Sequence, residues 1–455
     1  MKKNKVISLC LATIMSLSLI MTGCGSSSTV SDSTSDASPS SQAPASTASN
    51  SSASEDLTGG EKVKISFLNS KGEIDPQMQQ AAKDFMAKYP NITVESFVAP
   101  AGTSPFEKTM AMYAANSAPA LIMMDIGNIA QLKDKLLDLS SEKWVADAAV
   151  DMDSVKADGK IAAFPFAVEG FGLIYNKTLL EKANIDPTSI KTTNDLEAAF
   201  KALEAASISP IGVGPMSWSV GDHFSSLSIV NQSKDNAVID KYVADLKAGS
   251  VDLSKDPVFN GLISTFDLFV KYNSFKNDPL ANTYEKTCEL FAKGEFAFMF
   301  QGNWAWGGMT SFDTNNGQYG IIPVPVSNDA ATYGNTQISA GITKVVGIDK
   351  TQNTEVQQNA ARMFLNWLVY DAQGNDALVV KSNIIPAFKN ITVEPSDPLS
   401  KSVQAFVNSG NTVRFFGVPA DFGNNVGEAM LKYLAGQSDR AELTKTVQDY
   451  WKTVK

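Results

Sequence analysis

The sequence has few of the residues on which most enzymes and metal sites depend. Its 455 residues include three cysteines and a single histidine, His223. A Ser-His-Asp or Cys-His catalytic centre, or a histidine-rich metal site, would have to use that histidine. If Cys10 and Cys24 belong to the N-terminal leader region, Cys288 is left alone, which excludes an intrachain disulfide and a zinc site of two or four cysteines. We therefore expect no catalytic residue, metal or cofactor. We also expect Cys288 to be a buried structural thiol, and His223 to be a hydrogen-bonded loop or helix residue rather than a ligand.

Positive charge and long apolar segments are also scarce. The net charge is -10, so nucleic acid and other anionic surfaces are poor partners. After residue 24 no apolar run is long enough to span a bilayer, and we expect this part of the chain to lie outside the membrane. The length is sufficient for two domains.

The N-terminus has the layout of a lipoprotein leader. Three lysines within the first five residues precede an apolar stretch at 6–20, and Gly23-Cys24 follows it. Met21 stands where such leaders usually carry leucine. We predict cleavage after residues 1–23 and a diacylglyceryl group on Cys24, because two acyl chains anchor a protein stably. A plain signal peptide and an uncleaved anchor helix remain the alternatives.

A low-complexity segment follows Cys24. Half of residues 25–60 are Ser or Thr and none is aromatic, so the segment cannot bury enough surface to offset the entropy of ordering it. We predict a disordered tether over 24–60 and an ordered body that begins at Lys62.

The body begins with alternating strand and helix patterns. Apolar residues alternate in the strand segments and recur every three to four positions in the helical ones. The pattern predicts strands at 63–67, 92–98 and 120–124, with helices from the cap Asp75 to 88, at 106–115 and at 127–136. This βαβ order implies a parallel sheet. Further on, it predicts helices at 195–206, 257–272 and 357–370 and strands at 296–300 and 319–322.

Three ordered segments carry a family resemblance. They are residues 163–177 (AFPFAVEGFGLIYNK), residues 294–306 (GEFAFMFQGNWAW) continued by YGIIPVP at 319–325, and residues 338–343 (ISAGIT) followed by a helix with Phe364 and Trp367. Through them, residues 61–455 resemble the extracellular solute-binding proteins (family 1) of ABC sugar importers, especially maltodextrin- and oligosaccharide-binding lipoproteins.

The resemblance implies an α/β fold of the periplasmic-binding-protein type (type II-like), with two lobes, a hinge and a ligand cleft between the lobes. Binding would close the lobes by a hinge motion. The N-terminal lobe would comprise 61–167 and 341–390, and the C-terminal lobe 171–338 and 400–455. The chain would cross between them near 169–170, 339–340 and 391–399.

Aromatic residues are the first candidates for ligand contacts. Trp304 follows a strand and a Gly-Asn turn, and a flat indole matches the apolar face of a sugar ring. The resemblance implies that Trp304 stacks on sugar and that Trp218 covers the cleft, while Trp306 packs or lines its rim. Phe422, or else Phe416, would supply a last aromatic from the C-terminal segment.

Polar candidates lie at strand ends and within one apolar run. Glu169 interrupts the run 164–175, where a carboxylate needs a partner or a polar ligand. The resemblance implies that it binds sugar hydroxyls, and a structural salt bridge is the alternative. Asn69, Lys71 and Asp125 follow strands, where ligands of open α/β sheets bind. Lys71 lacks the acidic neighbour of similar proteins unless Glu73 replaces it.

Two departures from the maltodextrin-binding pattern concern aromatic positions. The tryptophan expected near Phe422 is absent, and Met123 and Met124 stand where an aromatic is expected before Asp125. Maltodextrin itself is therefore a doubtful ligand, although the class is unaffected.

The sequence thus predicts a non-enzymatic, monomeric binding protein, lipid-anchored on the extracellular face of the cell membrane, which delivers a carbohydrate, an oligosaccharide for preference, to ABC permease subunits. One alternative is a secreted glycoside hydrolase, which would need two facing carboxylates such as Glu169 and Asp125. A surface adhesin and a binder of polyamines or phosphate esters are the others. The cleft aromatics and the lack of a charged cluster disfavour a charged ligand.

Overall fold

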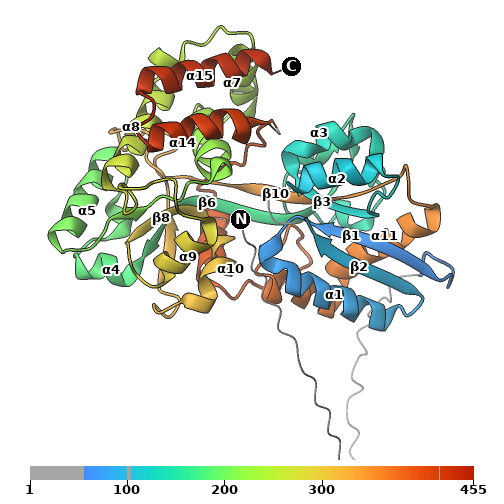
Figure 1. Cartoon of the computed structure of the whole chain (residues 1–455). Helices are drawn as coiled ribbons and strands as arrows, with labels where there is room; N and C mark the ends of the chain where they lie inside the picture. Colours follow the sequence, from blue (N-terminus) through green and yellow to red (C-terminus); the bar gives the residue numbers. More distant parts are fainter. Residues whose placement is uncertain (1–55, 100–103, 420, 455) are drawn as a thin grey trace, which may run out of the picture. The chain divides into compact units, whose positions relative to one another are not determined.

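The computed structural model describes residues 56–99, 104–419 and 421–454, which all belong to one compact unit (Figure 1). The predicted leader 1–23, the lipidation site Cys24 and residues 25–55 of the predicted tether lie outside the described residues.

The ordered body begins earlier than the sequence predicts. We expected order from Lys62, but a turn precedes it. The Asp56 carboxylate accepts hydrogen bonds from the backbone N–H groups of Thr58 and Gly60, at 2.9 and 3.1 Å. The Thr58 hydroxyl in turn accepts one from the Asn91 side chain at 2.8 Å. Aspartate and glycine favour such turns by local hydrogen bonding and positive φ, a signal hidden here by the low-complexity segment before it.

The predicted βαβ start of the body is confirmed. Strand β1 pairs in parallel with both β2 and β3. The elements are β1 (Val63–Asn69), α1 (Asp75–Lys88), β2 (Ile92–Val98), α2 (Pro105–Ala114) and β3 (Leu121–Asp125). Helix α1 begins at Asp75 with Ile74 as its cap, so Asp75 is not the cap that we predicted. The predicted helix at 127–136 has one α-helical turn, α3 (Ile129–Leu132), between 3-10 turns, and no side chain caps it.

The sheet is mixed, so the prediction of a parallel sheet holds only in part. Its order is β2-β1-β3-β10-β6-β8-β7, with β9 on β6 and β11 on β10. The two long strands β6 (Phe164–Asn176) and β10 (Ile338–Ile348) are antiparallel to each other and lie side by side through the middle of the molecule (Figure 1). The shorter strands are β7 (Ile211–Gly212), β8 (Phe298–Gly302), β9 (Tyr319–Ile322) and β11 (Thr412–Arg414). A two-stranded sheet of β4 (Lys156–Ala157) and β5 (Lys160–Ile161) is separate.

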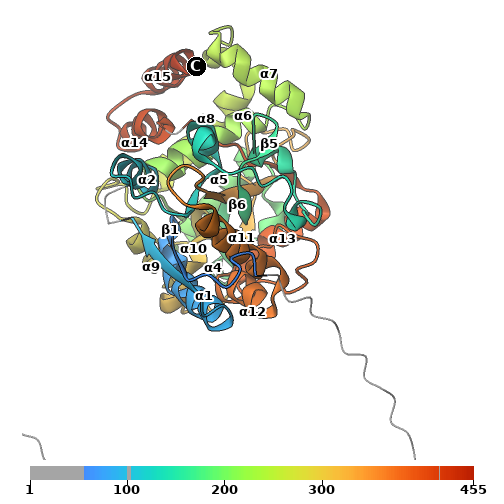
Figure 2. The ribbon, with the colours of Figure 1, turned by 90° about the vertical axis from the view of Figure 1, so that its right-hand side faces the viewer.

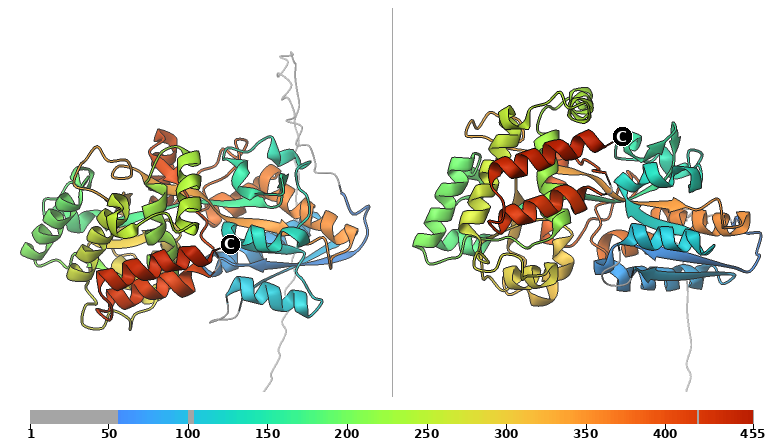
Figure 3. Two further views of the ribbon diagram at one scale, coloured as in Figure 1. Left: turned by 90° about the horizontal axis from the view of Figure 1, so that it is seen from above. Right: turned by 45° about the horizontal axis from the view of Figure 1, so that its top comes forward.

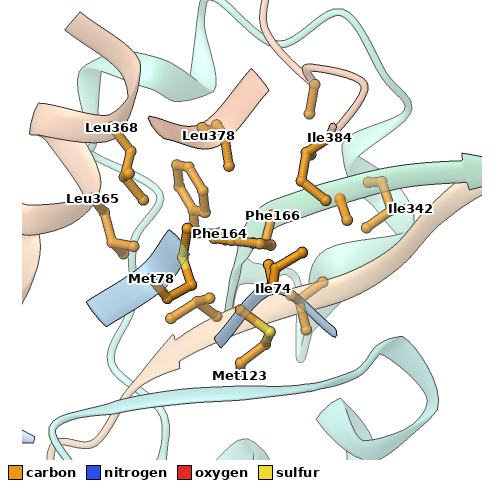
Figure 4. Packing of buried hydrophobic residues seen from close by; sticks show 14 of the residues in the cluster. Ile74, Met78, Met123, Phe164, Phe166, Ile342, Leu365, Leu368, Leu378 and Ile384 are labelled. Carbon is orange, nitrogen blue, oxygen red and sulfur yellow. The ribbon is translucent and has the colours of Figure 1, made fainter. Parts of the chain in front are cut away.

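One hydrophobic cluster surrounds the β1–β3 end of the sheet. Helices α1 and α11 (Glu355–Tyr370) contribute to it, and Figure 4 shows Met78, Met123, Phe164 and Leu365 pointing toward one another. Cys288 also belongs to this cluster. It is buried and free, and burial raises the pKa of its thiol to about 12. The prediction of a buried structural thiol is thereby confirmed.

A second cluster surrounds the β7–β8 end of the sheet. The helices α5 (Thr193–Ala205), α8 (Pro257–Tyr272), α14 (Glu428–Leu434) and α15 (Arg440–Thr453) contribute to it. Helices α14 and α15 lie side by side, and α7 (Asn236–Lys247) lies against α15 (Figures 2 and 3). The first cluster also extends to β8 and β9 through Met299 and Ile321, so the clusters do not divide the sheet cleanly. The lobe boundaries stated above stay a prediction.

Six further α-helices belong to the described part of the chain. They are α4 (Lys177–Lys182), α6 (Ser226–Val230), α9 (Tyr284–Ala292), α10 (Ala305–Met309), α12 (Ala372–Asn375) and α13 (Pro398–Ser409). The other predicted helices and strands are present, with ends shifted by up to two residues, as is usual for element boundaries. Within the described residues, no helix is both long and apolar enough to cross a membrane.

Candidate ligand-binding site

The loop after β1 is held by Asn69. Its side-chain amide donates to the Lys71 carbonyl oxygen at 3.1 Å, and its Oδ1 accepts from the Lys71 backbone N–H at 2.9 Å. Asn69 is fully buried and thus orients Lys71. The sequence placed Asn69 among the ligand contacts, but this geometry gives it a positioning role.

Lys71 forms a buried ionic network with two carboxylates. Its Nζ lies 2.7 Å from Glu169 Oε1 and 2.6 Å from Glu73 Oε1. The side chains of Lys71 and Glu169 are each 3% exposed. Burial alone would lower the pKa of Lys71, but the two carboxylates raise it above its ordinary value. Burial likewise opposes the charge on Glu73, yet the Lys71 ammonium holds the pKa of that carboxyl below its usual range.

The network ties the first loop to both long strands. Glu169 lies on β6, and its Oε2 accepts a hydrogen bond from the Thr343 hydroxyl on β10. The salt bridge that the sequence left as an alternative for Glu169 is therefore present. Glu73 stands beside Lys71, where the sequence left open whether an acidic neighbour exists.

The carboxylate of Asp125, the last residue of β3, also has an ion-pair partner. Asp125 is 61% exposed and forms an ion pair with Lys344 on β10. Glu169 and Asp125, the two carboxylates that the glycoside hydrolase alternative would use, each have a cationic partner.

Of the predicted aromatic residues, Trp218 lies close to Trp304, and both Trp304 and Trp306 lie close to the ionic network of Lys71. Trp304 follows β8 and its indole N–H donates to Gln301 Oε1 at 2.9 Å. Its ring is half-buried, with the Trp218 ring centroid 6.3 Å away. Trp306 lies two residues on, with its ring 6.2 Å from that of Tyr319.

A cavity joins Trp304 and Trp306 to the ionic network. Both tryptophans line it together with Lys71 and Glu169. Its other lining residues are Glu73, Ile74, Gln77, Asn303, Gly307, Thr310, Lys381, Ser382, Asn383 and Ile384. The structure thus brings Trp304, Trp306, Lys71 and Glu169 together, although they come from three distant parts of the sequence.

Asn303 is a member of this site that the sequence did not single out. Its Oδ1 accepts from the Gly170 N–H at 3.0 Å, and its Nδ2 donates to the Ser400 hydroxyl at 3.0 Å. It therefore ties the predicted crossing at 169–170 to the start of α13. The Gly-Asn turn before Trp304 indicated the position of Asn303. Its hydrogen-bond partners, Gly170 and Ser400, could not be predicted from the sequence.

Phe422 does not line the site, contrary to the prediction. It is 1% exposed and packs against Tyr450 and Trp451, with ring centroids 5.2 and 5.6 Å away. Phe416 likewise faces Trp451, at 6.5 Å. Phe415, in the same segment, packs instead against Phe171 and His223, with ring centroids 6.0 and 5.8 Å away.

The helical segment Trp218–Ser225 is a π-helix, a form often found at functional sites. It brings His223 against the tryptophans, with its ring 4.9 Å from Trp304 and 5.5 Å from Trp218. The expectation that His223 is fully hydrogen-bonded is wrong, because its buried Nδ1 finds no partner in the described part of the chain. Oδ1 of the adjacent Asp222 is also buried and also has no hydrogen-bond partner among the described residues. Nothing in the sequence alone indicated this pair.

Comparison with known proteins gives a family and a set of relatives. A family model described as "Bacterial extracellular solute-binding protein" matches residues 70–375. An uncharacterized ABC transporter extracellular-binding protein of Pyrococcus horikoshii is 25% identical over 426 residues, which cover 90% of this chain and 87% of the relative.

Solved structures give the same result for the fold. RafE in complex with raffinose has a TM-score of 0.71 at 16% identity, covering 86% of this chain and 98% of that one. RafE is a protein of Streptococcus pneumoniae. A sugar transporter from Bacillus licheniformis in complex with stachyose has a TM-score of 0.66 at 18% identity, covering 86% and 99%. The predicted two-lobed α/β fold is thereby confirmed.

Proposed function

The chain belongs to the bacterial extracellular solute-binding protein family, and on this premise we propose that it captures a neutral oligosaccharide between its two lobes and delivers it to the permease of an ABC importer. It does so as a monomer and without chemical change to the sugar. Members of the family and the similar proteins are binding proteins rather than enzymes.

The observation that carries this proposal is the placement of Trp304. Its half-exposed indole shares a cavity with the buried Lys71 and Glu169. An aromatic ring beside polar groups suits a sugar, which has an apolar C–H face and a rim of hydroxyls. Similar structures hold raffinose and stachyose, which are neutral oligosaccharides.

A charged ligand fits this site less well. Lys71 is ion-paired with two carboxylates, and Asp125 is paired with Lys344. A phosphate ester would need free cationic donors, and a polyamine would need free carboxylates. The network of Lys71, Glu73 and Glu169 carries one net negative charge, but each of its charged groups has an ion-pair partner, and its remaining hydrogen-bonding capacity suits the hydroxyls of a neutral sugar.

We also propose that the protein is held at the extracellular face of the membrane by a lipid on Cys24. An anchored protein on a tether keeps its ligand near the permease at high effective concentration. Replacement Cys24→Ser should move the protein from the membrane fraction to the culture medium, as followed by immunoblotting. Retention of this variant in the membrane fraction would contradict the lipid anchor.

Thermal-shift screening of residues 25–455 tests the proposed ligand class. The panel comprises raffinose, stachyose, maltose, a chitin oligosaccharide and a xylan oligosaccharide, with spermidine and glycerol phosphate as charged controls. We expect at least one sugar to stabilise the protein, by about 2.7 kcal/mol at a hundredfold excess over its dissociation constant. Stabilisation by a charged control alone would contradict the carbohydrate proposal.

A further inference from the structure

The π-helix Trp218–Ser225 is fixed in place by close backbone contact with a second π-helix, Gly423–Gly427. A Cβ added at Gly221 would overlap the backbone of Gly427, and one added at Gly423 would lie 3.2 Å from Asp222 Oδ1. The two segments approach this closely because these positions carry no side chain. The position of Asp222 and His223 is therefore set by the fold and does not depend on a flexible loop.

Two polar atoms of this segment lack partners. Asp222 Oδ1 and His223 Nδ1 are both buried, and neither has a hydrogen-bond partner within residues 56–99, 104–419 and 421–454. A buried polar atom without a partner lowers stability by about 1–3 kcal/mol. A ligand or an ordered water can supply the missing bond.

The surroundings of His223 indicate what kind of ligand fits. Its ring lies 4.9 Å from Phe171, 4.9 Å from Trp304 and 5.8 Å from Phe415. Aromatic faces offer apolar contact but no strong hydrogen bonds, so Nδ1 must be satisfied from another source. A sugar ring matches this mixture, because its hydroxyls lie next to apolar C–H groups.

The charges around the pair are few. Asp125 at the end of β3 and Lys344 on β10 act on both residues, and Tyr450 on α15 interacts electrostatically with Asp222. Burial, with a smaller contribution from Asp125, raises the pKa of Asp222 to about 7. Burial lowers the pKa of His223 to about 3, so the imidazole is neutral at physiological pH.

We propose that Asp222 and His223 are two further ligand contacts, each forming a hydrogen bond with a hydroxyl of the sugar that packs against Trp304. This inference rests on the proposed function, since it assigns residues to the same ligand. A hydroxyl donates to Asp222 Oδ1, and a second hydroxyl donates to Nδ1 of His223 or accepts from it, according to the tautomer.

The contribution of Asp222 to folding stability changes with pH in a defined direction. The pKa of Asp222 is raised on folding, so its contribution to stability is present below about pH 4, the range of an unfolded aspartate, and is lost as the pH rises to about 7. Replacement Asp222→Asn removes the charge, and the variant without sugar should melt at a higher temperature than the wild type at pH 8. If Asp222 had a purely structural role, Asp222→Asn would instead melt at a lower temperature than the wild type.

The decisive experiment compares stability with affinity in matched variants. At pH 8 we expect Asp222→Asn to weaken binding of the best sugar of the panel by about tenfold or more, as for a hydrogen bond to a charged group. Wild-type affinity should rise between pH 5.5 and 8.5, and that of Asp222→Asn should stay constant. His223→Phe keeps the ring packing, so its affinity should fall while its melting temperature is retained. Asp245→Asn on α7, which loses a surface ion pair with Lys241, controls for net charge.

The outcomes separate this inference from the proposed function. If the wild type binds a sugar and both variants bind it equally well, the inference is overturned and the function stands. A lower melting temperature of Asp222→Asn at pH 8 would also overturn it. If the wild type binds no sugar of the panel, the proposed function fails, and this inference fails with it.

Discussion

Replacing Trp304 by alanine is expected to weaken sugar binding by about 30-fold, which corresponds to about 2 kcal/mol, the size typical of a tryptophan at the centre of a binding site. The indole offers a large flat surface with little rotamer entropy to lose. It is already oriented, because its N–H donates to Gln301 and its ring lies over Gly302, where a Cβ would overlap it. Isothermal titration calorimetry with the best sugar of the panel measures the change.

Two further variants make this test specific. Trp304→Phe keeps a flat ring and should retain most of the affinity, while Trp306→Ala should have a smaller effect because Trp306 packs partly against Tyr319. Circular dichroism melting checks that each variant is folded. Unchanged affinity in a folded Trp304→Ala variant would refute the stacking role.

Replacing Lys71 by methionine is expected to lower the free energy of unfolding by about 3–5 kcal/mol. The change leaves Glu169 buried, with only the Thr343 hydroxyl as its partner. Glu73 loses its partner too, but its side chain is 25% exposed and can be hydrated. Urea unfolding of residues 25–455 measures the loss.

A double variant distinguishes ion pairing from packing. Lys71→Met combined with Glu169→Gln removes both charges of the buried pair and should recover much of the lost stability. A loss below 1 kcal/mol in Lys71→Met, or no recovery in the double variant, would contradict the buried network.

Most of the helices and strands that were predicted from the sequence are present, because their signals are local. Strands β1, β2 and β9 and the helices α8 and α11 follow from the spacing of their apolar residues. The pairing of strands is not a local property. The long strands β6 and β10 run antiparallel through the sheet, and no neighbouring pattern in the sequence shows this.

The site was predictable to the extent that the family resemblance located its residues. Trp304, Trp306, Lys71 and Glu169 meet at one cavity. Phe422 was misplaced because a phenylalanine in the core and one in a cleft look alike in sequence, whereas Phe415 of the same segment contacts His223. The unpartnered atoms of Asp222 and His223 depend on contacts between distant segments and could not be foreseen.

The central claim is that this protein binds an oligosaccharide and leaves it unchanged. Calorimetric titration of residues 25–455 with the best sugar of the panel, followed by chromatography of the same sample after prolonged incubation, tests both parts. We predict binding at a single site and recovery of the intact sugar. Appearance of shorter sugars that depends on Glu169, or the absence of binding by every sugar of the panel, would contradict the account.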